Sequence, residues 1–226
     1  MTTLKIHEVV SVQQVPGQPM PFDLKFSSKL NSAVVRGPGI YIITFEDKPV
    51  YLGKFQPFNR NNILQDRWLR HMETMTMRGV RVGFGKNACL EKLKAFLHTE
   101  IYTALERLPK EELNKKLRDT GVCTSIQRCK FTSSNWCYLK QAQPEEILNK
   151  YGFHFYKLEG LANAQEAKSV TSELENQLIK TYDFPINGTR GQHPAADFDE
   201  LVSSMANFLK QLAPTISVQL ALRLTE

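Results

Sequence analysis

The sequence predicts an α+β fold in which a small sheet is flanked by helices, and three segments carry that prediction. Residues 39–45 and 50–53 are rich in β-branched and aromatic side chains and enclose Glu46–Pro49, which is turn-forming, so they predict a β-hairpin. Residues 153–158 have the composition of a third core strand. A long amphipathic helix with one apolar face follows, and Asn163 is expected to cap it.

The flanking elements follow from the same kind of periodicity. Residues 1–36 are predicted to be β-rich, because Phe22–Phe26 alternates with period two. A helix is expected over 63–77, with a buried stripe formed by Leu64, Trp68, Met72 and Met75. A second amphipathic helix is expected over 196–212, with an apolar face formed by Phe198, Leu201, Met205, Phe208 and Leu212. Beyond Pro214, apolar residues fall on every second position from Ile216 to Leu224, which predicts a final half-buried strand.

The segment 78–152 is predicted to be an insertion between these core elements. Its composition predicts a helix over 90–108, a shorter charged helix over 109–117 and a helical turn over 144–150. Residues 123–139 have weak strand character.

Composition limits the class of protein. With 226 residues, of which 42% are hydrophobic, the chain has the makeup of a globular domain. No apolar run approaches the roughly 20 residues needed to span a bilayer, and the N-terminus lacks the basic and apolar regions of a signal peptide. The four cysteines include no Cys-x-x-Cys pair, which argues against a zinc site and favours reduced thiols. A cytoplasmic protein without a membrane partner is therefore expected.

The positive charge is concentrated in one stretch. The chain has 29 basic and 23 acidic side chains, a net charge of +6, and residues 54–94 hold nine basic against three acidic ones. This stretch is either an ordinary solvated surface or one that follows a phosphate backbone, and its position after the hairpin favours the second. The glycine-rich loop 187–193 is either a second contact or a plain turn. The candidate nucleic-acid contacts are Arg60, Arg70, Arg78, Arg81, Lys86, Arg190 and His193.

Two pairs of residues have a spacing that suits a catalytic site. Tyr41 and Tyr51 lie on the two strands of the predicted hairpin, and Lys54 follows at once. Arg67 and His71 are four residues apart on the predicted helix 63–77, so they share one helix face. Taken singly, Arg67 is most simply a surface cation and His71 a histidine at the edge of the core.

Glu175 is the candidate carboxylate. It follows Leu174 on the long helix and therefore lies at the edge of the apolar stripe, where a carboxylate can face a cleft while its helix stays packed. Its ordinary interpretation is a surface glutamate. Glu173 lies about 160° round the helix from Glu175 and cannot share its role.

Taken in chain order, these residues form a known pattern. It consists of Gly39-Ile40-Tyr41, Tyr51-Leu52-Gly53-Lys54, Arg67 with His71, Glu175 within Leu-Glu-x-x-Leu-Ile, and Asn187 after a tyrosine and a proline. The pattern resembles the GIY-YIG endonuclease superfamily. The resemblance implies a three-stranded antiparallel sheet flanked by helices, with a core at 38–77 and 153–190, an insertion at 78–152 and extensions at 1–37 and 191–226, all within a single domain spanning 1–226. Three features depart from compact members, namely a short hairpin spacer, a long loop before Arg67 and the insertion.

The resemblance implies a divalent-metal-dependent DNA endonuclease, which hydrolyses phosphodiester bonds. Glu175 would hold one Mg²⁺ or Mn²⁺ per active site, because no second carboxylate ligand is evident. Arg67 would donate to the scissile phosphate. Tyr41 or Tyr51 would act as a base toward water, helped by Lys54, Arg67 and His71, since a free phenol is a poor base at neutral pH. Asn187 would orient the glutamate or hold the phosphate region.

The decorated core resembles the stand-alone type II restriction endonucleases of this superfamily. That resemblance implies cleavage of double-stranded DNA at a short specific site by a homodimer, which supplies one site per strand. Two alternatives stay open. One is a structure-specific repair or mobile-element nuclease with the same chemistry, and the other is a nucleic-acid-binding domain that keeps the fold without hydrolysis.

Overall fold

A computed structural model describes residues 2–14, 22–26, 34–56, 62–77, 83–84, 90–117, 123–140, 144–188, 191–194 and 197–225. The chain forms two compact units. Unit 1 comprises residues 1–11, 26–68 and 148–226, and unit 2 comprises residues 12–25 and 69–147. Unit 2 thus takes in most of the predicted insertion 78–152, together with residues that the sequence assigned to the core and to the N-terminal extension. That the whole chain is one domain stays a prediction.

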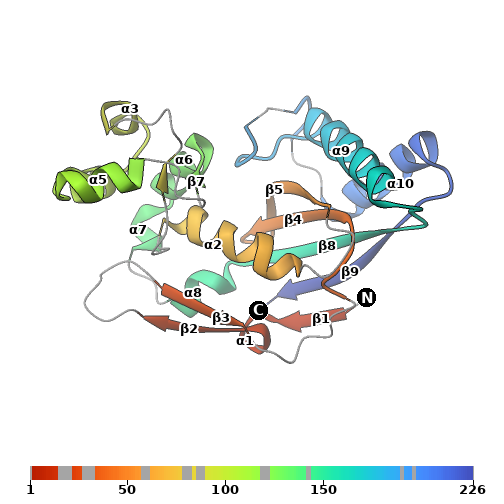
Figure 1. Ribbon diagram of the computed structural model, residues 1–226, viewed down its shortest axis with the longest axis horizontal. Coiled ribbons are helices and arrows are strands. Elements are labelled where there is room, and N and C mark those ends of the chain that lie inside the picture. The colour runs from red at the N-terminus through yellow and green to blue at the C-terminus, as the bar shows by residue number, and fades with distance from the viewer. Residues whose placement is uncertain are drawn as a thin grey trace. The chain divides into compact units, whose positions relative to one another are not determined.

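Unit 1 is built on a five-stranded sheet with the strand order β1-β9-β8-β4-β5 (Figure 1). Its strands are β1 (Thr2–Lys5), β4 (Gly39–Phe45), β5 (Lys48–Phe55), β8 (Tyr151–Glu159) and β9 (Ser217–Thr225). Neighbouring strands are antiparallel except β1 and β9, which are parallel, so the sheet is mixed.

The α+β prediction is confirmed, but the predicted sheet of three antiparallel strands is too small. Its three strands are present as β8-β4-β5, and two more strands extend the sheet. The predicted C-terminal strand forms as β9 and pairs with the second edge of β8, and β1 then pairs with β9. Alternation along a strand reveals that one face is buried but does not identify the neighbouring strand, which explains the error.

The predicted hairpin is present with a tighter turn than expected. Only Glu46 and Asp47 form the turn, and both have positive φ angles, of 50° and 62°. Two residues in this conformation match the right-handed twist of the flanking strands. Lys48 and Pro49, predicted as turn residues, belong to β5. A proline is tolerated there because β5 is the edge strand of the sheet.

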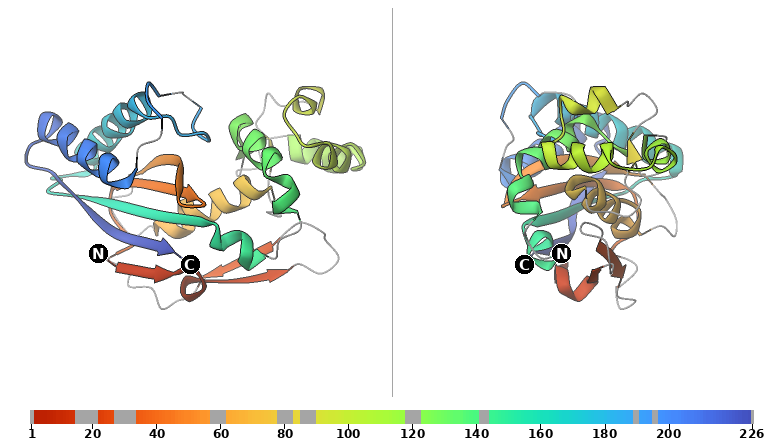
Figure 2. Two further views of the ribbon diagram at one scale, coloured as in Figure 1. Left: turned by 180° about the vertical axis from the view of Figure 1, so that it is seen from behind. Right: turned by 90° about the vertical axis from the view of Figure 1, so that its left-hand side faces the viewer.

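Two helices pack on one face of the sheet, α9 (Ala164–Thr181) and α10 (Phe198–Leu212), as the left view of Figure 2 shows. Asn163 caps α9 as predicted, since its Oδ1 accepts a hydrogen bond of 2.9 Å from the backbone of Glu166. The core between sheet and helices contains Ile40, Ile42, Leu52, Tyr156, Leu158, Val170, Leu174, Leu178, Leu201, Met205 and Leu209. Leu212, predicted on the apolar face of α10, is 44% exposed, and Leu209 is buried in its place.

The predicted helix over 63–77 has the right extent and a different first turn. Its first part is a π-helix, η1 (Leu64–Trp68), and its second part is α2 (Leu69–Thr76). All four residues of the predicted stripe are fully buried. The Oδ1 atom of Asn62 accepts a hydrogen bond of 2.9 Å from the backbone of Leu64 at the start of the helix. A π-turn is rare, and periodicity alone does not predict it.

The N-terminal segment also contains α1 (Ile6–Val9), and β2 (Val10–Gln14) and β3 (Phe22–Phe26) pair as a separate two-stranded sheet, which agrees with the predicted β-rich start. The remaining elements are β6 (Gly83–Phe84), α3 (Leu90–Lys94), α4 (Thr99–Glu106), α5 (Lys110–Leu117), β7 (Cys123–Thr124), α6 (Ile126–Ser134), α7 (Trp136–Leu139) and α8 (Pro144–Asn149). The predicted helices over 109–117 and 144–150 are therefore present.

Two predictions for the insertion are wrong. The helix over 90–108 is broken into α3 and α4, because His98 caps α4 by accepting a hydrogen bond from the backbone of Glu100. The strand over 123–139 is helical beyond Thr124. The buried residues of this segment are three and four positions apart, which is the spacing of a helix and which the strand prediction did not take into account. They are Cys129, Thr132, Trp136 and Leu139.

Candidate functional site

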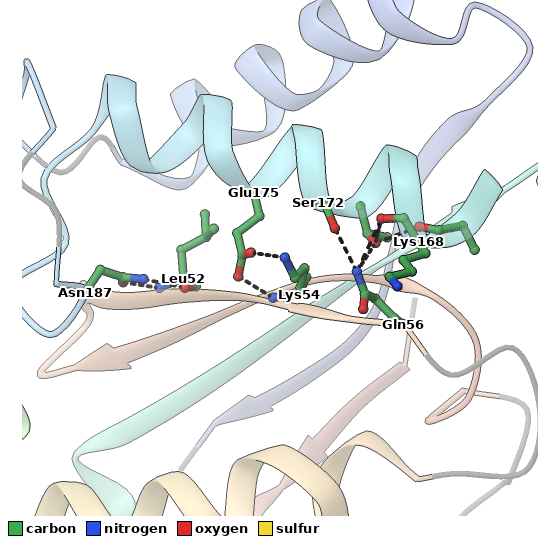
Figure 3. A network of polar contacts seen from close by, with 9 residues as sticks. Leu52, Lys54, Gln56, Lys168, Ser172, Glu175 and Asn187 are labelled. Carbon is green, nitrogen blue, oxygen red and sulfur yellow. Dashed lines mark hydrogen bonds and ion pairs between the residues drawn. The ribbon is translucent and has the colours of Figure 1, made fainter. Parts of the chain in front are cut away.

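The outer edge of β5 is where residues from distant parts of unit 1 meet (Figure 3). β5 is the last strand of the sheet, so one row of its backbone groups has no partner in β4. Side chains of α9 and of the loop after it bind these groups. Glu175 contacts Lys54 across 121 residues of sequence, and Asn187 contacts Leu52 across 135 residues.

Asn187 binds the backbone of β5 with its whole amide group. Its Oδ1 accepts a hydrogen bond of 2.9 Å from the Leu52 N–H, and its Nδ2 donates one of 2.8 Å to the Leu52 carbonyl. The neighbouring Ile186 N–H donates to the Val50 carbonyl at 2.9 Å. The loop after α9 thus continues the ladder of the sheet. From the sequence, Asn187 was expected to orient Glu175 or to hold the phosphate region. In the structure, both polar atoms of its amide bind the backbone of Leu52.

Within the described residues, Glu175 is held by Lys54. Its Oε1 accepts a hydrogen bond of 3.1 Å from the Lys54 backbone N–H, and its Oε2 lies 2.8 Å from the Lys54 Nζ. The Glu175 side chain is 16% exposed and the Lys54 side chain is 32% exposed, so the ion pair is partly open to solvent. The adjacent Leu174 is fully buried, which places Glu175 at the edge of the apolar stripe.

Glu173 occupies the other side of α9. Its Oε1 accepts a hydrogen bond of 2.9 Å from the Gln177 side chain, and it lines a groove with Phe208 and Leu212 of α10. Glu173 and Glu175 therefore face different surroundings, as the helix geometry predicts, and Glu173 is a matched control for Glu175.

The two tyrosines lie together on the opposite face of the sheet. Tyr41 pairs with Gly53 across the hairpin, and its ring centroid lies 6.0 Å from that of Tyr51 and 5.5 Å from that of Phe153. Gly53 is required here, because a Cβ atom would lie 2.6 Å from the Tyr41 Oη. Tyr41 is only 2% exposed, whereas Tyr51 is half-buried.

The hairpin consequently separates the predicted site residues into two groups. Ile40 and Ile42 pack toward α9, and Lys54 pairs with Ile40, so Lys54 lies on the α9 face. Tyr41 alternates with these residues and points the other way. The motif pattern assigned all of them to one catalytic site, with the two tyrosines forming one wall of it. The separation was predictable, because Tyr51 and Lys54 are three positions apart on one strand and must face opposite sides.

The remaining predicted residues are distributed over both units. Arg67 is half-buried in η1 of unit 1, and His71 is buried in α2 of unit 2. Arg70 and His193 are exposed. Arg60, Arg78, Arg81, Lys86 and Arg190 lie outside the described residues.

Gln56 is a contact at this edge that the sequence reading missed. Its Nε2 lies 2.9 Å from the Ser172 hydroxyl and 3.3 Å from both the Thr171 hydroxyl and the Lys168 carbonyl (Figure 3). Gln56 follows Lys54 by two residues, so strand periodicity extends the row of α9 contacts to it. Together, Asn187, Glu175 and Gln56 fasten β5 to α9 and to its following loop.

The side chains at this edge could hold a divalent cation only in a site with a single protein carboxylate, Glu175. In the described part of the chain, no group of three or more His, Cys, Asp or Glu side chains is placed to hold a metal ion. Mg²⁺, however, commonly binds through one or two carboxylates and takes its other ligands from water and substrate phosphates. The Lys54 ammonium beside Glu175 indicates that a positive charge is accommodated at this carboxylate. The residues present therefore fit an ion held by Glu175 and completed by substrate.

Comparison with known proteins identifies no relative, since no family model, curated protein or solved structure matches the chain. Among the described residues, no helix has both the length and the apolar character to cross a membrane.

Proposed function

We propose that this chain is a divalent-metal-dependent DNA endonuclease of the GIY-YIG type, which hydrolyses phosphodiester bonds in double-stranded DNA. The proposal includes a homodimer with one Mg²⁺ or Mn²⁺ per active site, sequence-specific cleavage of the type II restriction kind, and a cytoplasmic location. Its basis is the ordered set of motif residues in the sequence.

One observation carries the proposal. Lys54, Glu175 and Asn187, which the motif joins only by order along the chain, converge on a single strand edge. A chance match of short motifs has no reason to bring these three residues together. Glu175 is 121 residues from Lys54 in the sequence, and Asn187 is 135 residues from Leu52, whose backbone it binds. The partial exposure of the Glu175–Lys54 pair leaves room for a ligand at its solvent side.

The chemistry assigned to the residues follows from their types and places. Glu175 is the ligand of the divalent ion, which when bound would neutralise charge on the phosphate and on the leaving oxygen. Such an ion would compete with the Lys54 ammonium for Oε2 of Glu175. Lys54 and Arg67 are then donors for phosphate oxygens.

Burial distinguishes the two tyrosines, which the motif leaves equivalent. Of the two, Tyr51 is the phenol that water can reach, because it is half-buried while Tyr41 is covered, and both phenols lie on the sheet face opposite Lys54. Asn187 acts as a positioning residue, since it holds Leu52, which lies between Tyr51 and the Gly53–Lys54 pair.

The test is incubation of supercoiled plasmid DNA with the protein in Mg²⁺ or in EDTA. Discrete linear fragments that require Mg²⁺ support a restriction enzyme. Nicks or a smear support a nuclease with less specificity, such as a repair or mobile-element enzyme. Absence of cleavage across several DNA substrates, with Mg²⁺ and with Mn²⁺, contradicts the proposal.

A specific observation favours one alternative, a nucleic-acid-binding domain without hydrolysis. Both tyrosines lie on the sheet face away from Glu175, and Tyr41 is covered. Glu175 and Asn187 satisfy backbone groups of an edge strand, which is a structural role in itself. Binding of DNA without cleavage would support this alternative. If the protein neither binds nor cleaves DNA, both functions are excluded.

A further inference from the structure

The positive charge of this protein is unequally divided between its two units. Unit 2 holds 15 basic and 10 acidic side chains, a net +5, whereas unit 1 holds 14 basic and 13 acidic ones, a net +1. A surplus of this kind in one compact unit favours a polyanionic partner for that unit.

Two lysines of unit 2 are held above aromatic rings. The Lys94 ammonium, at the end of α3, lies 5.7 Å from the centre of the Tyr102 ring on α4. The Lys130 ammonium, on α6, lies 5.0 Å from the centre of the Phe96 ring. Both distances are within the range of a cation–π interaction. Because Phe96 follows Lys94 by two residues, the two pairs are neighbours.

These contacts orient the lysines without cancelling their charge. Four other lysines in the described ranges, Lys54, Lys140, Lys150 and Lys157, form ion pairs with glutamates. Lys94 and Lys130 form no carboxylate ion pair with any residue in the described ranges. A ring attracts an ammonium through its quadrupole and carries no net charge, so the full positive charge stays available to a ligand.

The surroundings of the two lysines are also suited to contact. Both side chains are exposed, and the Phe96 and Tyr102 rings are half-buried. Ile126 lies one helical turn before Lys130 on α6 and is 47% exposed, so an apolar side chain stands at the surface beside this lysine. The patch thus combines fixed cations with an apolar contact.

We infer that the patch formed by Lys94, Phe96, Tyr102, Ile126 and Lys130 is a docking surface for the phosphate backbone of duplex DNA. The choice of duplex DNA rests on the proposed function, whereas the choice of a polyanion rests on the charge of unit 2. The two lysines contact phosphates and position the duplex without reading its sequence.

The experiment is a binding titration of the full-length protein with a fluorescently labelled duplex of about 30 base pairs, in EDTA, at salt concentrations from about 50 to 200 mM. The double variant Lys94→Gln/Lys130→Gln should bind at least about tenfold more weakly near 100 mM salt, and the slope of log K against log salt should fall by about 2. The charge-retaining variant Lys94→Arg/Lys130→Arg should bind like the wild type.

Lys140→Gln is the matched control. It removes one positive charge from the same unit, but this charge is compensated by Glu100, whose pKa is lowered chiefly by its hydrogen bond from Lys140. Its affinity should therefore stay within about twofold of the wild type. A double variant with an unchanged salt slope, or a control that loses as much affinity as the Lys94→Gln/Lys130→Gln variant, would overturn the inference.

The outcomes separate this inference from the proposed function. DNA binding that depends on Lys94 and Lys130, without cleavage in Mg²⁺, sustains the surface and contradicts the nuclease. Cleavage together with binding that ignores both lysines sustains the nuclease and overturns the surface. A wild-type protein that binds duplex RNA but not duplex DNA, or neither of them, also overturns it.

Discussion

Replacement of Glu175 separates a chemical role of this carboxylate from a structural one. Glu175→Gln keeps an oxygen that can accept the hydrogen bond from the Lys54 N–H, and it removes the negative charge that a cation requires. Glu175→Ala removes both. A purely structural residue should tolerate glutamine, whereas a metal ligand should tolerate neither change.

The magnitudes follow from the contacts. The ion pair with Lys54 is partly exposed, at 32% and 16%, so its loss in Glu175→Gln should cost less than about 1 kcal/mol of unfolding free energy. Glu175→Ala also leaves the Lys54 N–H without its acceptor, which adds about 1 kcal/mol, for a total of about 1–2 kcal/mol. Loss of even a second-sphere partner of a metal ligand costs 10–100-fold in metal affinity or activity, so both variants should lose more than about 100-fold in cleavage.

The assay combines urea denaturation with the rate of plasmid cleavage in Mg²⁺. Glu173→Gln is the control, because Glu173 is on the same helix and its side chain also accepts one hydrogen bond, from Gln177. This variant should cleave at the wild-type rate. The assignment is refuted if Glu175→Gln cleaves DNA within tenfold of the wild type, or if Glu173→Gln is equally impaired.

Two further predictions concern a cation and a proton. Lys54→Met should raise the affinity for Mn²⁺, measured by electron paramagnetic resonance, about threefold to fivefold, because the ammonium no longer competes for Glu175; weaker Mn²⁺ binding would contradict the competition. His154 is buried against Phe198, and burial, with a smaller effect of Arg223, lowers its pKa to about 4 from 6.5. The folded state therefore favours the neutral imidazole. The free energy of unfolding is unaffected by this group above pH 6.5, and it decreases as the pH falls from 6.5 toward 4, because the unfolded chain then binds the proton more readily. Between pH 7 and pH 5 the loss should be about 2 kcal/mol in urea denaturation and should be absent in His154→Gln; equal losses in both proteins would contradict the assignment.

Local pattern was sufficient for most elements of unit 1. Alternation and turn chemistry predicted the hairpin of β4 and β5, and the capped apolar stripe predicted α9 within a residue or two. These signals work because side-chain burial repeats every two residues in a strand and every 3.6 in a helix. In 123–139 the weak strand composition predicted a strand, whereas the helical spacing of the buried residues from Cys129 to Leu139 agrees with the structure.

Glu175 and Lys54, two residues predicted for the candidate site, are in contact, whereas the arrangement of the other predicted residues was not predictable. The edge position of Glu175 followed from its place beside Leu174, and the contact with Lys54 agrees with that position. The partner of Asn187 was not predictable, because its amide binds a backbone 135 residues away and any exposed edge would serve it equally. The opposite orientation of Tyr51 and Lys54 was implied by strand alternation, yet the order of motifs along the chain does not contain it.

The sequence by itself determined most strands and helices of unit 1, and it indicated which side chains could carry chemistry. The tertiary structure alone decided that β9 and β1 enlarge the sheet, that β5 is its edge, and that Glu175, Asn187 and Gln56 close that edge. The physical reason is the range of the interactions. Periodicity reports on neighbours a few residues apart, whereas the choice of strand partner is made by backbone hydrogen bonds between distant segments, whose donors and acceptors are the same at every residue except proline.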